Sequence, residues 1–199
     1  MLLLNYMKMA AQDLRDVAGI LSQPRPTDAR FPRSVYQHEG GDRLMEFVAL
    51  QELSGLGELL GDPSWRETES LVRPRLVVDY RRQIHALRDV VKPPASPVPS
   101  GDRIQLTRAE IAPRKLDEYH AWCRDSFFPH VRAQEQVEGF TAYHSVLSTE
   151  PGALLLAQFS CPFEEYLESQ KTPGYQELTR HAASSYVLGA VATSNWTRL

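Results

Sequence analysis

Apolar and polar residues alternate along this chain with two different periods. Short apolar runs bounded by turn residues predict strands, and apolar residues spaced three or four apart predict helices. The first half gives strand Leu2–Met9, helix Gln12–Ser22, strands Ser34–Glu39 and Leu44–Glu52, helix Leu56–Leu71 interrupted at Pro63, and strand Arg75–His85. The order β-α-β-β-α-β is that of a ferredoxin-like fold.

The same order restarts in the second half. Its predicted strands are Arg103–Ile111, Gly139–Ser148, Ala153–Ser160 and Ser185–Thr197. Its predicted helices are a long one from Pro113, kinked or restarted at Pro129, and the short Phe163–Gln170 and Pro173–Ala182. Proline is expected to interrupt the long helix because it lacks an amide hydrogen.

A proline-rich segment lies between the two halves. Residues 92–102 contain four prolines and no periodic apolar pattern, which predicts a stiff, extended linker. The sequence therefore predicts an α+β protein with a ferredoxin-like unit at 1–91, a linker at 92–102 and a second ferredoxin-like unit at 103–199.

Matched residues indicate that the second unit repeats the first. Residues 139–177 correspond to residues 34–67, and residues 112–118 correspond to 10–16. The matched pairs are Tyr36 with Tyr143, Gln51 with Gln158, Pro63 with Pro173, Trp65 with Tyr175, and Glu67 with Glu177. The separation grows from 102 to 107 to 110 residues along the chain, as expected if the second copy gained residues in its helical regions.

Composition and charge exclude several classes of protein. Hydrophobic residues make up 42% of the chain and charged residues 24%, as in soluble globular proteins. The net charge of -3 gives no electrostatic footprint for nucleic acid or an anionic membrane. Cys123 and Cys161 have no metal or redox spacing, which suits a reducing compartment. The apolar start is broken by Asn5 and Lys8, unlike a signal peptide, so we expect a cytoplasmic protein.

Several short motifs resemble the dimeric α+β-barrel superfamily, in its EthD-like and antibiotic biosynthesis monooxygenase-like branches. They are Leu-Asp-Glu-Tyr-His-Ala-Trp at 116–122, Phe-Pro at 128–129, Val-Glu-Gly-Phe at 137–140, Pro-Gly-Tyr at 173–175, and residues 47–53 and 62–65 of the first half. The resemblance implies two ferredoxin-like units packed sheet to sheet into a barrel, here within one chain. It implies a monomer with an internal pseudo-dimer, with a homodimer as the alternative. The histidine of the EthD-like His-aliphatic-Pro triplet falls on Phe127, so that acid/base group is absent.

Histidines and tyrosines on the predicted strands and the long helix are the candidate catalytic residues. Tyr143 and His144 are neighbours on a strand and must point to opposite faces, whereas Tyr36 and His38 share a face. His120 lies on the long helix, beside a predicted pocket between helix and sheet. Histidine titrates near neutrality and can transfer protons. The alternative is that the tyrosines fill the core and the histidines lie at its rim or on the surface.

Aromatic residues at matched positions are the candidate substrate-binding residues. Trp65 and Tyr175 each follow a proline, and Tyr119 and Trp122 flank His120. Such side chains can stack on a flat substrate or can simply fill the core. Arg81 could bind a phenolate or carboxylate, or could blunt an exposed sheet edge. We expect the pocket in the second half.

The sequence favours chemistry without a cofactor or a metal. Nucleotide, hydrolase and metal-ligand motifs are missing, including a His-x-x-x-His spacing. The first hypothesis is a cyclase or dehydratase that acts on an aromatic or polyketide-like molecule. The alternatives are a cofactor-independent monooxygenase that oxidises a phenol with O2, and a non-catalytic ligand-binding barrel. Related barrels hold haem through an axial histidine, but none of the six histidines lies in a matching sequence context.

Overall fold

The computed structural model describes residues 1–148 and 150–199, and its strands form one closed barrel. The strands are β1 (Leu2–Lys8), β2 (Arg33–His38), β3 (Arg43–Ala49), β4 (Arg81–Lys92), β5 (Arg103–Ile111), β6 (Gly139–Leu147), β7 (Ala153–Phe159) and β8 (Val187–Arg198). They follow the order β1-β3-β2-β8-β5-β7-β6-β4, and all neighbouring pairs are antiparallel. The predicted α+β class and the barrel of two ferredoxin-like halves are confirmed.

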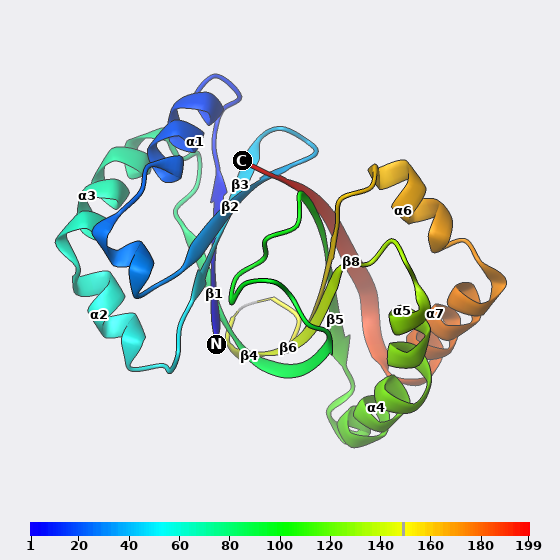
Figure 1. Ribbon diagram of the computed structural model, residues 1–199. Coiled ribbons are helices and arrows are strands. Elements are labelled where there is room, and N and C mark those ends of the chain that lie inside the picture. Colours follow the sequence, from blue (N-terminus) through cyan, green and yellow to red (C-terminus); the bar gives the residue numbers. More distant parts are fainter. Residues whose placement is uncertain (149) are drawn as a thin grey trace.

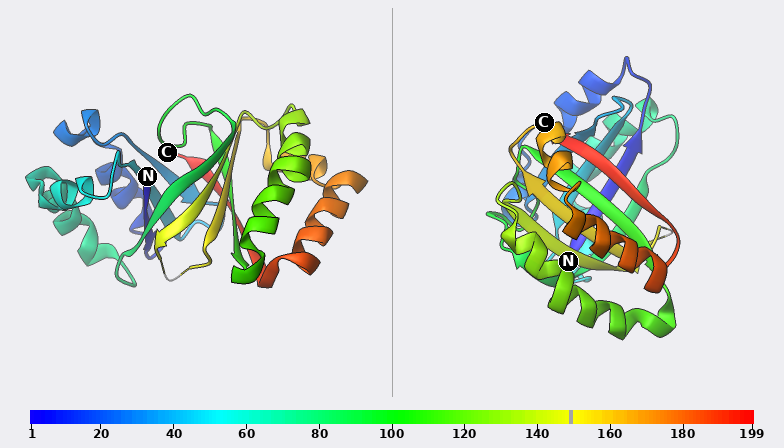
Figure 2. Two further views of the ribbon diagram at one scale, coloured as in Figure 1. Left: turned by 90° about the horizontal axis from the view of Figure 1, so that it is seen from below. Right: turned by 90° about the vertical axis from the view of Figure 1, so that its right-hand side faces the viewer.

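Each half of the chain contributes four adjacent strands, and helices cover its outer face. The helices are α1 (Leu14–Ser22), α2 (Gly55–Gly61), α3 (Pro63–Val72), α4 (Leu116–Trp122), α5 (Phe128–Ala133), α6 (Phe163–Ser169) and α7 (Pro173–Ser185). Helices α1 to α3 lie on one side of the barrel and α4 to α7 on the opposite side (Figures 1 and 2). The halves join where β2 pairs with β8 and where β4 pairs with β6.

Alternation along the strands separates the barrel interior from the helical layers. From β1, Leu2 and Leu4 point inward, whereas Leu3 packs beneath the first-half helices. The barrel core contains Leu2, Leu4, Tyr36, Met45, Phe47, Val98, Ile104, Leu106, Leu154, Leu156 and Trp196. Antiparallel strands with covered outer faces need apolar side chains on both sides, which explains the near-continuous apolar run of β1.

The predicted strand Arg75–His85 was wrong in its boundaries. The strand β4 runs from Arg81 to Lys92, because it pairs with β1 near its start and with β6 over most of its length. Residues 73–75 form a short 3-10 helix instead. The interruption predicted at Pro63 is a complete break, because the Asp62 side chain accepts the backbone N–H groups of Ser64 and Trp65 and caps a new helix.

The long second-half helix passes through a π-helical turn, Cys123–Phe127, between α4 and α5. The Phe128 amide donates to the Cys123 carbonyl, and Pro129 is the second residue of α5. Proline has no amide hydrogen to donate to the preceding turn, and the helix widens into the π-helical turn directly before Pro129. The structure describes no helix that is both long and apolar enough to cross a membrane.

The proline-rich segment covers one end of the barrel (Figure 1). Val98 is buried in the barrel core, and the Tyr36 hydroxyl donates to the Gly101 carbonyl at 2.8 Å. The backbone N–H groups of Ser100 and Gly101 both donate to Gln158 Oε1, at 2.8 and 3.1 Å. The segment therefore joins the halves and also closes one mouth of the barrel, which the sequence did not predict.

Candidate functional site

An apolar cavity of about 430 Å³ lies between the second-half sheet and its helices. This volume falls within the usual range for small-molecule sites. The sheet supplies Gln105, Thr107, Ala109, Phe140, Leu155, Ala157, Val187 and Val191. The helices supply Tyr119, Trp122, Phe127, Tyr166, Tyr175, Gln176, Thr179, Arg180, Ala182 and Ala183.

Small side chains on the sheet and large rings on the helices create this space. Ala109 and Ala157 form part of the floor on β5 and β7. Above them, the ring of Trp122 stacks on Tyr119 and Phe127, with centroid distances of 6.1 and 5.7 Å. Aromatic walls of this kind favour a flat ligand, since stacked rings gain contact area and dispersion energy.

The tyrosines that line the cavity remain protonated at neutral pH. Burial raises the pKa of Tyr119 well above its usual value, and the neighbouring Cys123 adds to this effect. Burial also raises the pKa of Tyr166 and of Tyr175. A protonated phenol donates a hydrogen bond, so these groups suit a ligand oxygen that carries partial or full negative charge.

A chain of side-chain hydrogen bonds fixes the polar corner of the cavity. The Tyr166 hydroxyl and the Gln170 amide both donate to Gln105 Oε1, at 3.3 and 3.0 Å. The Gln105 amide in turn donates to Asn195 Oδ1 at 3.2 Å. Because the Gln105 oxygen already accepts two donors, its amide is held in one orientation beside the cavity.

The predicted binding residues separate into three places. Tyr119, Trp122 and Tyr175 line the same cavity. Trp65 lies in the first-half core, where its Nε1 donates to Glu69 and the Arg25 guanidinium covers its ring. Arg81 lies at the open mouth of the barrel.

Three of the five predicted catalytic residues are brought together, but away from the large cavity. His120, Tyr143 and His144 line one recess of about 10 Å³ beside α4, too small for a substrate. Tyr143 and Tyr36 belong to the barrel interior, and the Tyr36 hydroxyl is engaged by Gly101. His38 shares the face of Tyr36, as predicted, but lies at the open mouth against Trp196, with ring centroids 4.9 Å apart. None of these five side chains lines the large cavity.

The cavity does not suit a haem held by an axial histidine. Its lining residues in the described part of the chain include no histidine, although haem barrels of this kind need one. The described residues also contain no cluster of three or more histidine, cysteine or acidic side chains that could hold a metal ion.

The polar corner and most of the sheet floor were not among the predicted site residues. Gln105 and Thr107 alternate with the inward-facing Ile104 and Leu106 along β5. This alternation was visible in the sequence, but it could not show that the helices above leave a gap. Tyr166 comes from α6, which the pattern predicted as a helix without indicating its partner.

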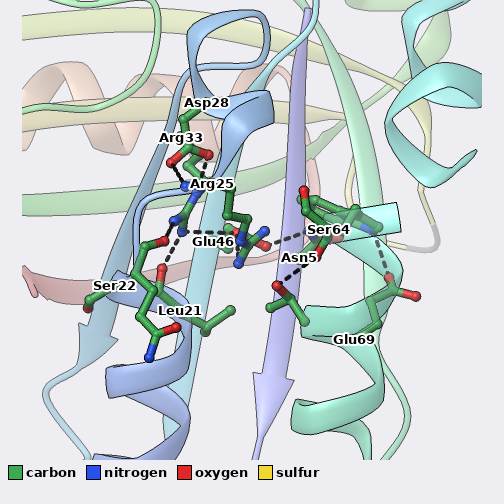
Figure 3. A network of polar contacts seen from close by, with 12 residues as sticks. Asn5, Leu21, Ser22, Arg25, Asp28, Arg33, Glu46, Ser64 and Glu69 are labelled. Atoms are coloured by element: carbon green, nitrogen blue, oxygen red, sulfur yellow. Dashed lines mark hydrogen bonds and ion pairs between the residues drawn. The ribbon is translucent and has the colours of Figure 1, made fainter. Parts of the chain in front are cut away.

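The same layer of the first half is filled by buried charges (Figure 3). Glu46, only 2% exposed, accepts a hydrogen bond from Asn5 Nδ2 at 3.0 Å. Arg25 and Arg33 approach Glu46 at 3.2 and 3.6 Å, and Arg33 also pairs with Asp28 at 2.7 Å. The Arg25 contact is an ion pair without the alignment of a hydrogen bond, since Glu46 Oε1 has no hydrogen-bond partner among the described residues.

Comparison with known proteins identifies the fold. No family model and no curated protein matches the sequence. A proposed monooxygenase from Fusobacterium nucleatum matches with a TM-score of 0.76 and 6% identity, covering 100% of this chain and 91% of that one. An anthrone oxidase-like protein matches with a TM-score of 0.71 and 11% identity, covering 100% of this chain and 90% of that one. A ferredoxin-fold protein from Listeria monocytogenes, related to antibiotic biosynthesis monooxygenases, matches with a TM-score of 0.55 and 8% identity. The match covers 100% of this chain and 95% of that one. The chain thus has the same fold as these three proteins.

Proposed function

We propose that this protein oxidises a flat, electron-rich phenol or anthrone-type molecule with O2, without a bound cofactor, in the second-half cavity. The observation that carries the proposal is the cavity itself: about 430 Å³, walled by Tyr119, Trp122 and Tyr175, with a fixed amide at Gln105. The fold shared with an anthrone oxidase-like protein and with monooxygenase-like proteins supports the same reading.

The lining groups suit stabilisation of a substrate anion better than proton removal by the protein. In an anthrone-type substrate a methylene becomes a ketone: two C–H bonds break, one oxygen atom of O2 forms the carbonyl, and the other leaves as water. The reactive form of such a substrate is its enolate. The neutral phenol of Tyr175 and the remaining N–H of the Gln105 amide can donate hydrogen bonds to that oxygen anion beside the apolar walls of the cavity. The Tyr166 hydroxyl already donates to the Gln105 oxygen and so fixes that amide.

A cavity-filling substitution tests the proposal. Ala109→Met places a long side chain on the floor of the cavity, whereas Ala133→Met makes the same change on the exposed end of α5. With 1,8-dihydroxyanthrone, wild type and Ala133→Met should consume O2 faster than the buffer blank, with anthraquinone formed in equal amount. Ala109→Met should lower kcat/KM by at least about tenfold, because the ring and the new side chain compete for one space.

The pH profile separates this chemistry from histidine-based cyclisation or dehydration. The rate should rise with pH as the substrate ionises, with no inflection near pH 6 to 7, where histidine titrates. A histidine inflection, together with loss of activity in His144→Gln or His120→Gln, would support the cyclase or dehydratase hypothesis. No O2 uptake above the blank with any competent phenol or anthrone would overturn the oxygenase.

A non-catalytic ligand-binding barrel is the second candidate. It is favoured by the pKa values of the lining tyrosines, which leave the cavity without a base that acts near neutrality. In that case a polycyclic phenol should quench the fluorescence of Trp122 and raise the melting temperature, while its concentration stays constant under air. Ala109→Met should weaken this binding as well.

A further inference from the structure

A second cavity, of about 400 Å³, opens at the uncovered mouth of the barrel. It is lined by Tyr6, His38, Arg43, Arg81, Gln83, Arg108, Glu150, Ala192, Thr193, Ser194 and Trp196. Arg108 follows Ile104 and Leu106 on the inward face of β5, whereas Gln105 and Thr107 face the other way, into the large cavity. The two cavities therefore lie on opposite faces of the sheet and have no lining residue in common.

This barrel-mouth cavity carries an excess of positive charge. Three arginines line it and only one carboxylate, Glu150. Arg43 has Asp42 as a partner at 2.9 Å, and Arg81 lies 3.9 Å from Glu150. The two arginines at the rim, Arg81 exposed and Arg43 half-buried, are thus each paired with a carboxylate of the protein.

Arg108 has no such partner in the described part of the chain. No carboxylate oxygen of the described residues lies within 4.0 Å of its guanidinium nitrogens, although the residue is only 9% exposed. Its Nε is buried and has no hydrogen-bond partner among the described residues. An unpaired buried guanidinium is costly, and burial lowers the pKa of Arg108 for the same reason.

The surroundings offer a ligand both an anion-binding end and an apolar wall. Trp196 is fully buried, and the rings of Tyr6 and His38 contact it edge-on, with centroid distances of 6.4 and 4.9 Å. His85, close to Arg108, is also buried, and its Nδ1 has no described partner. Burial, Arg108 and His144 lower the pKa of His85 to about 4, so this imidazole is neutral at pH 7. Its Nε2 faces Gln83 Oε1 at 3.3 Å and donates to it, which leaves Nδ1 as an acceptor.

We propose that the barrel-mouth cavity binds the oxyanion of a small ligand, a carboxylate or a phosphate, with Arg108 as its buried anchor. The planar fork of a guanidinium matches both groups, which accept two parallel N–H bonds. Arg43 and Arg81 add charge at the rim, and the tryptophan and tyrosine rings leave space for an apolar body. This site is independent of the proposed oxidation and would remain if that function were wrong.

Calorimetric titration of the whole protein tests the site with benzoate and with inorganic phosphate, at constant ionic strength in chloride. Benzamide serves as the neutral isostere of benzoate. Benzoate, phosphate or both should bind, and benzamide should not. Benzoate binding assigns the site to carboxylates with an apolar body, whereas binding of phosphate alone assigns it to phosphate-bearing ligands.

Two substitutions show whether Arg108 is the anchor. Arg108→Leu and Arg108→Gln should each weaken anion binding at least about tenfold, the loss expected for a charge-assisted hydrogen bond. Arg114→Gln, an exposed arginine on the same half, should bind as wild type does. In wild type labelled with ¹⁵N, the Arg108 Nε–H resonance should shift on anion addition.

The unliganded stability gives a separate readout. Arg108→Leu should keep or raise the melting temperature without anion, because it replaces an unpaired buried charge with an apolar side chain next to Leu106 and Leu154. The proposal is overturned if neither anion binds wild type more tightly than chloride does. It is equally overturned if both Arg108 variants retain wild-type affinity for the anion.

Discussion

The outer faces of the two half-sheets place opposite chemistry at corresponding positions. In the first half, Asn5 on β1 pairs with Glu46 on β3, and in the second half, Thr107 on β5 pairs with Leu155 on β7. Each pair lies next to an inward-facing pair of the barrel core, which is Leu4 with Phe47 in the first half and Leu106 with Leu156 in the second. The first pair belongs to a buried ion network and the second lines an open cavity.

The neighbouring strands repeat this contrast. Arg33 on β2 pairs with Val48, whereas Phe140 on β6 pairs with Ala157. Arg33 reaches over the sheet to Asp28 and Glu46 and closes the first-half layer. Phe140 and Ala157 instead line the second-half cavity. The same framework thus supports a closed, charged layer in one half and a hollow, apolar layer in the other.

Removing the central charge of the closed layer should have the largest effect on stability. Glu46→Leu imports the residue found at the corresponding position of the open half and leaves Arg25 and Arg33 without their shared buried carboxylate. We expect the free energy of unfolding to fall by about 3 to 5 kcal/mol, measured by urea denaturation. Glu58→Leu, which breaks an exposed pair with Arg30, should change it by about 1 kcal/mol or less.

A double substitution shows whether the loss comes from unpaired charge. In Glu46→Leu combined with Arg25→Leu, one of the stranded cations is gone, so part of the lost stability should return. If the double variant is instead less stable than Glu46→Leu, by as much as a second independent core substitution would cost, packing and not charge holds the layer together.

The barrel interior differs between the halves as well, and acid should reveal it. His85 faces Leu2 on β1, and Trp196 faces Ile104 at the corresponding position on β5. Burial, Arg108 and His144 lower the pKa of His85 from 6.5 to about 4. The unfolded chain therefore binds a proton between these values that the folded chain does not, so stability falls as the pH falls from about 6.5 to 4.

The expected contribution of His85 is on the order of 3 kcal/mol across this range. It is measured as the difference between the pH dependence of unfolding for wild type and for His85→Gln. His181→Gln, on the outer helix α7, provides the control, and its curve should follow that of wild type. Parallel curves for wild type and His85→Gln between pH 6.5 and 4 would contradict the buried, neutral imidazole.

The sequence was sufficient for the framework because alternation and turn residues depend on local pattern. It predicted the succession of strands and helices along each half, and Tyr36 and Tyr143 do lie at corresponding positions, opposite Met45 and Leu154. The other strand match failed: Gln158 lies within β7, whereas Gln51 follows the end of β3. Identical residues at a fixed separation in the sequence do not guarantee the same register once a strand changes length.

The candidate site was only partly predictable for a different reason. The pattern predicted Tyr119, Trp122 and Tyr175 as substrate-binding residues or core residues, but it could not show whether the layer between helices and sheet is filled. That depends on pairs distant in sequence, such as Arg25 with Glu46, for which a single sequence gives no distance. Likewise, the sequence around Arg108 does not show that this residue is buried, because its burial depends on closure of the barrel.

The smallest expected effect concerns the few polar contacts of the open half. Tyr166→Phe removes the 3.3 Å hydrogen bond to Gln105 but keeps the ring stacked on Phe159, with centroids 4.0 Å apart. Gln105 Oε1 still accepts a hydrogen bond from Gln170, so no buried acceptor loses its last partner. The free energy of unfolding should therefore fall by only about 0.5 to 1.5 kcal/mol. Tyr186→Phe, whose ring lies beside Trp122, provides the matched control and should change stability by less.

The same two variants test the role of Tyr166 in the reaction. If Tyr166 orients Gln105 for the substrate oxygen, Tyr166→Phe should lower kcat for anthrone oxidation while KM stays nearly constant. Equal kcat in both variants would restrict Tyr166 to packing.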